Sequence, residues 1–279
     1  MKDPCISIVT PSYNQGEFLE NTILSVLEQD YPNLEYIIMD GGSTDGSLDI
    51  IKKYSKHLTY WQSQPDGGQV DAINAGLQRA KGEIFTFLNS DDFLLLGAID
   101  HMVGLYLKNP NSVGWVGGGH SITEDGYIIH TRFPKKIDRD GLADWGENWF
   151  NQPSCFFTAA AARAVGFLNP GYKLGFDFDF WLRITKLGKL IPTKKIISAA
   201  TIHLYAKTQQ FKTEIYLENQ AIQLAHGFEM QAKKTQRFID QTSKQTLIGT
   251  FAKLLFVTQN QKKLDPNRYV RFPNKLIIE

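Results

Sequence analysis

Short apolar runs alternate with amphipathic segments over the first 110 residues of the chain. Four runs are rich in β-branched and aromatic residues, which predicts buried strands at residues 6–10, 36–39, 58–61 and 83–88. Between them, apolar residues recur about every 3.6 positions, as at Phe18, Ile23 and Leu27, which predicts helices. Strands that alternate with helices indicate a mostly parallel sheet with helices on both faces.

The pattern changes after residue 110. Residues 113–121 and 127–131 flank Glu124-Asp125-Gly126, which predicts a β-hairpin. Residues 154–158 form a short strand-like run, and the spacing at 176–187 predicts a helix. Residues 209–260 have helical spacing without strand alternation. We therefore expect one domain over residues 1–208, with halves at 1–110 and 111–208, and a helical extension over 209–279.

Composition restricts the class of protein. The chain has 279 residues, 42% of them hydrophobic, and a formal net charge of +1, which fits a soluble globular protein without a general affinity for nucleic acid. Two cysteines lie far apart, no apolar run is long enough to span a membrane, and the N-terminus lacks the shape of a signal peptide. We therefore expect a cytoplasmic protein.

An apolar stripe lies among lysines in the basic part of the chain, at Leu247, Phe251 and residues 254–257. Such a stripe is compatible with a helix on an anionic lipid surface, which would place the protein at the inner face of the membrane. The alternatives are that this segment packs on the domain of residues 1–208 or contacts a second copy of the chain.

Polar residues gather where the predicted strands end, at residues 10–14, at Asp40 and at residues 89–92, with a further group at 66–71. In an open parallel sheet, ligands bind beyond the carboxyl ends of the strands. An aromatic ring there can stack on a nucleobase, and a carboxylate can accept hydrogen bonds from the base. The alternative is that acids such as Asp40 and Asp45 only cap turns.

The sequence lacks two common nucleotide-binding motifs. Residues 10–16 carry no G-x-G-x-x-G fingerprint, and no phosphate loop of the form G-x-x-x-x-G-K-[ST] is present. The diphosphate of a nucleotide must then be neutralised in another way. Asp91 or Asp92 could hold a divalent cation, Mn²⁺ or Mg²⁺, because hard cations favour carboxylate and phosphate oxygens.

Four segments together resemble the inverting GT-A-fold glycosyltransferases of family 2. They are residues 9–14 (VTPSYN), 37–47 (IIMDGGSTDGS), 66–69 (DGGQ) and 87–92 (FLNSDD), in the order and spacing of that family. The resemblance extends over about residues 4–205. It implies a Rossmann-like sheet flanked by helices, a mixed β region on the acceptor side in residues 111–208, and a GT-A catalytic domain over residues 1–208.

The resemblance also implies a donor site. Tyr13 would stack on the pyrimidine and Asp40 would bind it, and Asn89 replaces the first acid of the D-x-D motif, so that Asp91 becomes the metal ligand. The remaining implied contacts with the donor nucleotide are Thr10, Pro11, Asp66, Gln69 and Ser90.

Residues 175–183 (GFDFDFWLR) resemble the family's segment with the catalytic base. The resemblance makes Asp177 the general base, with Phe176 where Glu is common. Asp179 lies about 200° further around the helix, so the two acids cannot share one role. We expect Asp179 to pair with Arg183 or to lie toward the acceptor; the alternative is that both acids only favour the start of the helix.

Further implied contacts are less specific. Gln152 would touch the acceptor or the donor sugar, and Trp149 would stack on a sugar unless it belongs to the core. His203 would reach the metal or the diphosphate, and Lys207 a phosphate, although a lone histidine is often structural.

Together these residues predict a metal-dependent inverting glycosyltransferase. It would move a sugar from a UDP- or dTDP-sugar to a hydroxyl of a glycan or lipid-linked acceptor, in the synthesis of cell-surface polysaccharide. The departures at Asn89 and Phe176 keep a catalytically degenerate nucleotide-sugar-binding protein as the alternative. The missing glycine fingerprint disfavours a nicotinamide-dependent oxidoreductase, whereas a nucleotidyltransferase stays open on fold alone.

Overall fold

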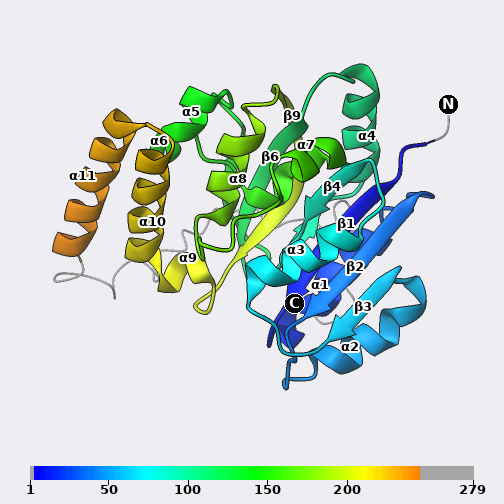
Figure 1. The fold of residues 1–279 in the computed structure, drawn as a ribbon. Helices are drawn as coiled ribbons and strands as arrows, with labels where there is room; N and C mark the ends of the chain where they lie inside the picture. The colour runs from blue at the N-terminus through cyan, green and yellow to red at the C-terminus, as the bar shows by residue number, and fades with distance from the viewer. Residues whose placement is uncertain (1–2, 246–279) are drawn as a thin grey trace.

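A nine-stranded sheet lies at the centre of the described part of the chain, residues 3–245 of a computed structural model (Figure 1). The first half supplies five strands and four helices. They are β1 (Ile6–Ser12), α1 (Gly16–Leu27), β2 (Leu34–Asp40), α2 (Ser47–Tyr54), β3 (Tyr60–Ser63), α3 (Gln69–Arg79), β4 (Ile84–Phe87), β5 (Asp92–Leu94) and α4 (Ala98–Lys108).

The second half completes the sheet and adds the helices at one end of the molecule. Its elements are β6 (Gly114–Thr123), β7 (Ile128–Arg132), α5 (Arg139–Ala143), α6 (Trp145–Asn148), the 3₁₀ helix η2 (Gln152–Ser154), β8 (Cys155–Thr158), α7 (Ala159–Ala164), α8 (Phe176–Ile184), β9 (Leu190–Ile202), α9 (Lys207–Gln210), α10 (Lys212–Ala225) and α11 (Glu229–Gln245). Helices α10 and α11 lie side by side beyond α8 (Figure 1).

The strand order is β3-β2-β1-β4-β8-β6-β9-β5, with β7 paired to β6. Strands β1 to β4 are mutually parallel, β8 is antiparallel to both β4 and β6, and β9 is parallel to β6. The carboxyl ends of β1, β2, β3, β4, β6 and β9 therefore meet at one edge of the sheet. The chain also enters β5 and β8 at this edge, which we call the carboxyl edge.

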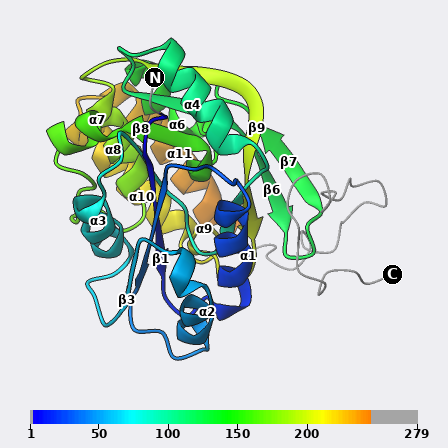
Figure 2. The same cartoon turned by 90° about the vertical axis from the view of Figure 1, so that its right-hand side faces the viewer.

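Helices cover both faces of the sheet, and each face has its own apolar core. Helices α1 and α4 lie on one side, and α3, α7 and α8 lie on the other (Figure 2). The first core includes Ile23 and Met102 with Ile8 and Ile38 from the sheet. The second is dominated by aromatic residues of β4, β8 and α8. Burial of this much apolar surface is the main stabilising contribution to such a fold.

The structure confirms the four strands expected in the first half and the hairpin of residues 113–131, which has a register shift between Ser121 and Ile122. It also shows two strands that the sequence pattern had not indicated. β9 combines exposed Lys194 and Lys195 with an apolar second half, and β5 begins with the acid Asp92. A lysine pair and a leading carboxylate both obscure the apolar pattern on which strand prediction depends.

The expected helical extension is present as α10 and α11 up to residue 245. The apolar stripe at Leu247, Phe251 and residues 254–257 lies outside the described residues. No helix within residues 3–245 has both the length and the apolar character needed to cross a bilayer. The division into a domain over 1–208 and an extension over 209–279 stays a prediction.

Candidate active site at the carboxyl edge of the sheet

Asp40 lies at the end of β2 and orders the loop that follows it. Its Oδ2 accepts hydrogen bonds from the backbone N–H of Gly42 (3.1 Å) and of Ser43 (2.9 Å) and from Ser63 Oγ (2.6 Å), and its Oδ1 accepts from Ser43 Oγ (2.5 Å). The side chain has 0% exposure. Asp40 thus caps the turn after β2, as the alternative expects, and its contact with a base stays a prediction.

Thr10 and Pro11 are also buried, contrary to the expectation that they face the nucleotide. Side chains alternate along a strand, so Thr10 shares the face of Ile6 and Ile8, which belongs to the core under α1. There Thr10 Oγ1 lies 3.1 Å from the hydroxyl of Tyr36. Thr10 and Pro11 therefore belong to the buried end of β1 and do not form an open surface.

Tyr13 and Asp66 are the exposed residues that converge at this end of the sheet. Tyr13 is 64% exposed, and Asp66 is exposed on the loop before α3. A Cβ atom on Gly41 would lie 3.2 Å from Cδ2 of Tyr13 and 3.3 Å from Oδ1 of Asp66. The ring of Tyr13 and the carboxylate of Asp66 thus approach the backbone at Gly41, which has no side chain. A flat base could stack there on the ring of Tyr13 and donate a hydrogen bond to Asp66.

A chain of amide hydrogen bonds links α3 to the loop after β4. Lys207 Nζ donates to Gln69 Oε1 (2.7 Å), Gln69 Nε2 donates to Asn89 Oδ1 (2.8 Å), and Asn89 Nδ2 donates to Asp92 Oδ2 (3.1 Å). Asp92 is buried, and burial together with the neighbouring charge of Asp91 raises the pKa of its carboxyl. The side-chain amide of Asn89, which stands where the D-x-D motif has its first acid, is therefore bonded on both sides. Asp92 has a structural role as the buried acceptor at the end of this network.

Asp91 and His203 form the candidate cation site. Asp91 Oδ2 lies 3.0 Å from His203 Nε2; the Asp91 side chain is 20% exposed and that of His203 is fully buried. His203 Nδ1 has no hydrogen-bond partner among the described residues, and Phe18 packs against the ring. Neighbouring Ser90 is buried, and its carbonyl accepts a hydrogen bond from Thr22.

The donor set at this pair fits a divalent cation that also binds a diphosphate. No group of three or more His, Cys, Asp and Glu side chains within residues 3–245 could hold a metal alone. One carboxylate and one imidazole leave most coordination positions free, and Mg²⁺ commonly combines one or two protein ligands with substrate phosphates. Asp91 and His203 would therefore hold the cation only together with the donor.

Asp177 lies in the first turn of α8. Its Oδ1 accepts a hydrogen bond from the N–H of Phe178 (2.7 Å), and the side chain is half-buried. Burial raises the pKa of Asp177 to about 7, and the charge of Glu218 adds to the rise. Its charge also adds to the effect of burial in raising the pKa of Cys155, the first residue of β8. A carboxylate with a pKa near neutrality suits a general base.

Glu218 on α10 holds the segment before α8, a role that the sequence had not indicated. Its carboxylate accepts hydrogen bonds from the backbone N–H groups of Lys173 (2.8 Å), Leu174 (2.6 Å) and Gly175 (2.5 Å). Glu218 and Asp91 also both act on Lys207, where burial lowers the pKa and the two acids raise it. Lys207 is therefore within electrostatic reach of both the candidate cation site and the residue that holds the segment before α8.

Asp179 pairs with Arg183, as expected, and does not lie toward an acceptor, which was the other expectation. Its Oδ2 accepts from Arg183 Nε (2.7 Å), its Oδ1 lies 2.9 Å from His226 Nε2, and it is 2% exposed. The helix turns Asp179 away from Asp177 and into the interface with α10. The expectation that Asp179 contacts the acceptor or the sugar is therefore corrected: Asp179 forms a structural ion pair.

Gln152 and Trp149 lie on the segment that leads into β8. Gln152 Nε2 donates to the carbonyl of Phe87 at the end of β4 (2.8 Å), and its Oε1 is buried without a partner among the described residues. Trp149 is half-buried, with the guanidinium carbon of Arg132 3.6 Å from its ring centre. Gln152 thus reaches the carboxyl edge directly, and one face of Trp149 is covered by an arginine.

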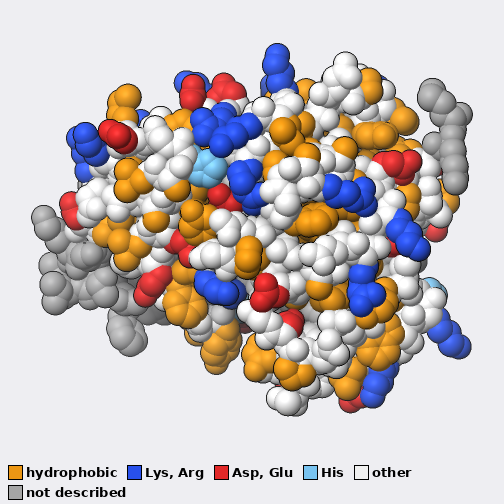
Figure 3. Space-filling view, viewed as in Figure 1, with side chains coloured by type: hydrophobic (Ala, Val, Ile, Leu, Met, Phe, Trp, Pro, Cys, Tyr) orange, Lys and Arg blue, Asp and Glu red, His pale blue; other side chains and the backbone are white. Residues whose placement is uncertain are grey.

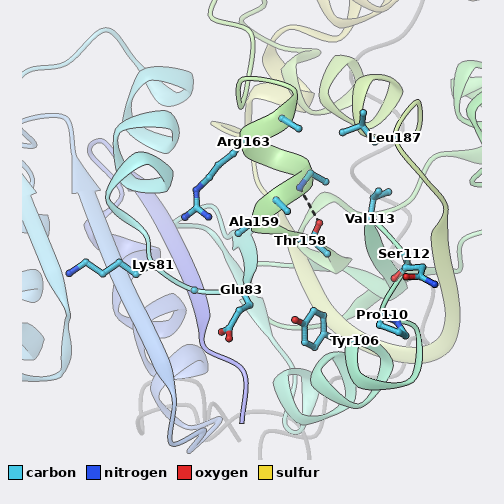
Figure 4. Close-up of a pocket in the computed structure, with 15 residues that line it drawn as sticks. Lys81, Glu83, Tyr106, Pro110, Ser112, Val113, Thr158, Ala159, Arg163 and Leu187 are labelled. Carbon is cyan, nitrogen blue, oxygen red and sulfur yellow. Dashed lines mark hydrogen bonds between the residues drawn. The ribbon is translucent and has the colours of Figure 1, made fainter. Parts of the chain in front are cut away.

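A cavity of about 610 Å³ opens at the opposite edge of the sheet (Figure 4). It is lined by residues that precede β4 and β6, among them Glu83 and Ser112, and by Arg163 of α7. Arg163 is already engaged, because it donates to the carbonyl of Ala80. None of the candidate residues lines this cavity, and we place the site by the convergence of its side chains rather than by cavity size.

The charges on the face formed by α3 and α8 are mixed. Lys and Arg side chains occur in several separate groups among acidic and apolar ones (Figure 3). This distribution agrees with the net charge of +1 and shows no continuous basic surface on that face.

Comparison with known sequences identifies a family and several relatives. The family described as Glycosyl transferase family 2 matches residues 7–164. The putative teichuronic acid biosynthesis glycosyltransferase TuaG of Bacillus subtilis is 43% identical over 94 residues, which are 32% of this chain and 36% of that protein. An uncharacterized glycosyltransferase of Mycobacterium tuberculosis is 40% identical over 187 residues, 64% of this chain and 68% of that protein. The chain spans 36%, 45% and 64% of the relatives from B. subtilis, Haemophilus influenzae and Rickettsia typhi.

Comparison with solved structures identifies the fold. TarS of Staphylococcus aureus in complex with UDP-GlcNAc superposes with a TM-score of 0.62 at 18% identity, over 79% of this chain and 66% of TarS. A mannosyltransferase of Pyrobaculum calidifontis in complex with GDP-Man and Mn²⁺ gives 0.58 at 15% identity, over 88% of this chain and 76% of that one. At these identities the likeness concerns the fold alone, and it confirms the fold class expected from the sequence.

Proposed function

The chain belongs to glycosyl transferase family 2, and on this premise we propose that it is a metal-dependent inverting glycosyltransferase. It transfers a sugar from a UDP- or dTDP-sugar to a hydroxyl group. The observation that carries the proposal is the convergence at the carboxyl edge: Phe87 at the end of β4 packs on Phe176, which precedes Asp177, and Lys207, bonded to Gln69, is within electrostatic reach of Asp91 and Glu218. Donor-side and base-side residues therefore border one site.

The base of the donor lies against the ring of Tyr13, with the carboxylate of Asp66 accepting hydrogen bonds from its edge. Asp40 supports the contact of Tyr13 and Asp66 with the base indirectly, because its hydrogen bonds to Gly42 and Ser43 hold the loop that follows Gly41. Aromatic stacking on a nucleobase contributes about 1–3 kcal/mol. Tyr13 and Asp66 thus select a nucleotide while leaving its diphosphate directed toward the loop after β4.

The diphosphate is held at the loop after β4 by Asp91, His203 and Lys207. A cation bound by Asp91 and His203 would stabilise the charge that develops on the leaving diphosphate. Lys207, which is held by Gln69 in this structure, also interacts electrostatically with Asp91 of that loop. It can exchange this neutral partner for a phosphate oxygen when the donor binds.

Asp177 takes the proton of the acceptor hydroxyl. The acceptor oxygen attacks the anomeric carbon from the side opposite the diphosphate, so one C–O bond forms as the other breaks and the configuration inverts. The electron pair of the broken bond leaves with the diphosphate, and the proton goes to a carboxylate oxygen of Asp177. Gln152, whose Oε1 has no hydrogen-bond partner among residues 3–245, would accept a hydrogen bond from a hydroxyl group of the bound sugar.

The acceptor is proposed to be a cell-surface polysaccharide or a lipid-linked precursor. The relative named for teichuronic acid biosynthesis and the fold shared with TarS support this class. Location in the cytoplasm, with peripheral contact at the inner membrane face, stays an expectation from the sequence.

A catalytically degenerate nucleotide-sugar-binding protein is the second candidate. Phe176, where the family commonly has Glu, is 6% exposed and packs on Phe87, so this position serves the core here. Hydrolysis of UDP-sugars without acceptor, in the presence of Mn²⁺, separates the two candidates. If the chain is an enzyme, it should release UDP slowly, and Asp91→Ala should abolish this release. If every UDP- and dTDP-sugar binds but none is hydrolysed, the result would favour a catalytically degenerate binding protein.

A further inference from the structure

Two basic side chains of β7 lie against Trp149 in the acceptor-side half. Residues 130 and 132 are two apart in a strand, so they point to the same face. The guanidinium carbon of Arg132 is 3.6 Å from the ring centre of Trp149, and the ring of His130 meets Trp149 edge-on, with ring centres 6.0 Å apart. We call these three residues the Arg132 cluster.

The cluster has basic groups without acidic partners. Nε of Arg132 and Nε2 of His130 are buried with no hydrogen-bond partner in the described part of the chain. No ion pair within residues 3–245 includes Arg132. Burial lowers the pKa of Arg132, and burial with the charge of Arg132 lowers that of His130. A half-buried cation without a counter-ion is costly, and an anion from outside would offset that cost.

Hydrogen bonds connect β7, the strand that carries Arg132 and His130, to the carboxyl edge. Thr131, between the two basic residues, lies 2.8 Å from Nδ1 of His120, and the carbonyl of His120 accepts from Asn151 Nδ2 (2.7 Å). Asn151 precedes Gln152, which is bonded to the end of β4. Oδ1 of Asn151 is buried and, like Oε1 of Gln152, has no partner among the described residues. Asn151 and Gln152 therefore connect β6 to the end of β4, and each has an amide oxygen without a partner in the described part of the chain.

Aromatic rings connect the cluster to the base. Trp149 packs on Trp145 with ring centres 6.4 Å apart, and Trp145 packs on Phe178 at 5.3 Å. Phe178 directly follows Asp177. The cluster thus lies one tryptophan away from the residue next to the catalytic base, on the acceptor side.

We propose that Arg132, His130 and Trp149 form an acceptor subsite for a sugar that carries a negatively charged group, a carboxylate or a phosphate. This inference rests on the proposed function, because it names the class of acceptor for the same active site. Arg132 supplies the fork of N–H donors that suits both anions, Trp149 holds the guanidinium flat, and His130 adds a further donor. The amide oxygens of Asn151 and Gln152 accept sugar hydroxyl groups.

The test measures the affinity of small acceptor fragments for the full chain saturated with UDP and Mn²⁺. Methyl β-glucuronide and glucose 6-phosphate are compared with neutral methyl β-glucoside by titration. We expect at least one anionic fragment to bind about tenfold tighter than the neutral one. The fragment with the greater preference identifies the anion as carboxylate or phosphate. Equal affinity for all three fragments would overturn the proposal without the use of any variant.

Arg132→Met removes the charge and keeps an apolar stem on Trp149. We expect the anion preference to disappear while the affinity for UDP stays unchanged. Arg79→Met is the matched control, because Arg79 stacks on Tyr60 at 4.3 Å outside this cluster; this variant should keep the preference. A preference that survives in Arg132→Met would contradict the assignment. Failure of UDP to bind the natural chain would instead contradict the proposed function, so the two failures are distinguishable.

Discussion

Replacing Asp177 by Asn should stop transfer and stabilise the fold at the same time. The substitution keeps the shape of the side chain and removes its charge and basicity. Because Asp177 is the proposed base, turnover should fall to background, while UDP binding, which depends on Tyr13 and Asp91, should persist. The change in stability follows from the altered pKa of the carboxyl group.

The pKa of Asp177 rises from 3.8 to about 7 on folding. Each pKa unit corresponds to 1.36 kcal/mol, so the ionised carboxylate opposes folding by at most about 4 kcal/mol above pH 7. Solvent at this half-buried side chain reduces the figure. The folded protein holds the proton up to about pH 7 and the unfolded chain releases it near pH 4, so this group lowers stability as pH rises between those values. Asn lacks this dependence.

Urea unfolding of both proteins at pH 5 and at pH 8 measures the difference. The advantage of Asp177→Asn should be about two to three times larger at pH 8 than at pH 5. Asp49→Asn serves as control, because Asp49 is an exposed first-turn acid of α2 whose removal should change stability by only a few tenths of a kcal/mol. Equal stability of Asp177→Asn and the natural chain at both pH values would refute the burial argument, and retained turnover would refute the role as base.

Three further substitutions test the surrounding contacts. Glu218→Gln removes a charge that raises the pKa of Asp177, so the acidic limb of the pH profile of kcat/KM should move below pH 7; an unmoved limb would contradict the contact. Tyr13→Ala should weaken UDP binding by about 1–3 kcal/mol in titration calorimetry, and unchanged affinity would remove Tyr13 from the base site. Asp179→Asn removes the buried negative charge that pairs with Arg183 and should lower the free energy of unfolding by about 3–5 kcal/mol, whereas a neutral effect would contradict the buried ion pair.

The parts of the fold that depend on local sequence pattern could be predicted from the sequence. The strands β1 to β4, the hairpin of β6 and β7, and helix α8 each have an apolar periodicity that depends only on neighbouring residues. The spacing of four within one helix also predicted the pairing of Asp179 with Arg183, which the structure confirms. The structure places His203 beside Asp91, as the resemblance implied; its role as a ligand stays a proposal.

Other features depend on the direction of a side chain or on contacts distant in the chain. Thr10 and Asp40 stand at strand ends, but the period of two places both side chains on the face of Ile8 and Ile38, where they are buried, and the motif alone does not reveal this. Glu218 contacts residues 173–175 through the return of α10 to α8, a tertiary contact without a local signal. The Arg132 cluster likewise requires β7 and the segment before β8 to meet.

Titration of UDP into the full chain, with Mn²⁺ and with chelator, tests the central claim most directly when repeated on Asp91→Ala. The account predicts binding that needs the cation in the natural chain and is lost or greatly weakened in the variant. Binding of equal affinity in Mn²⁺ and in chelator, or in the natural chain and Asp91→Ala, would contradict a cation and diphosphate held at the carboxyl edge by Asp91.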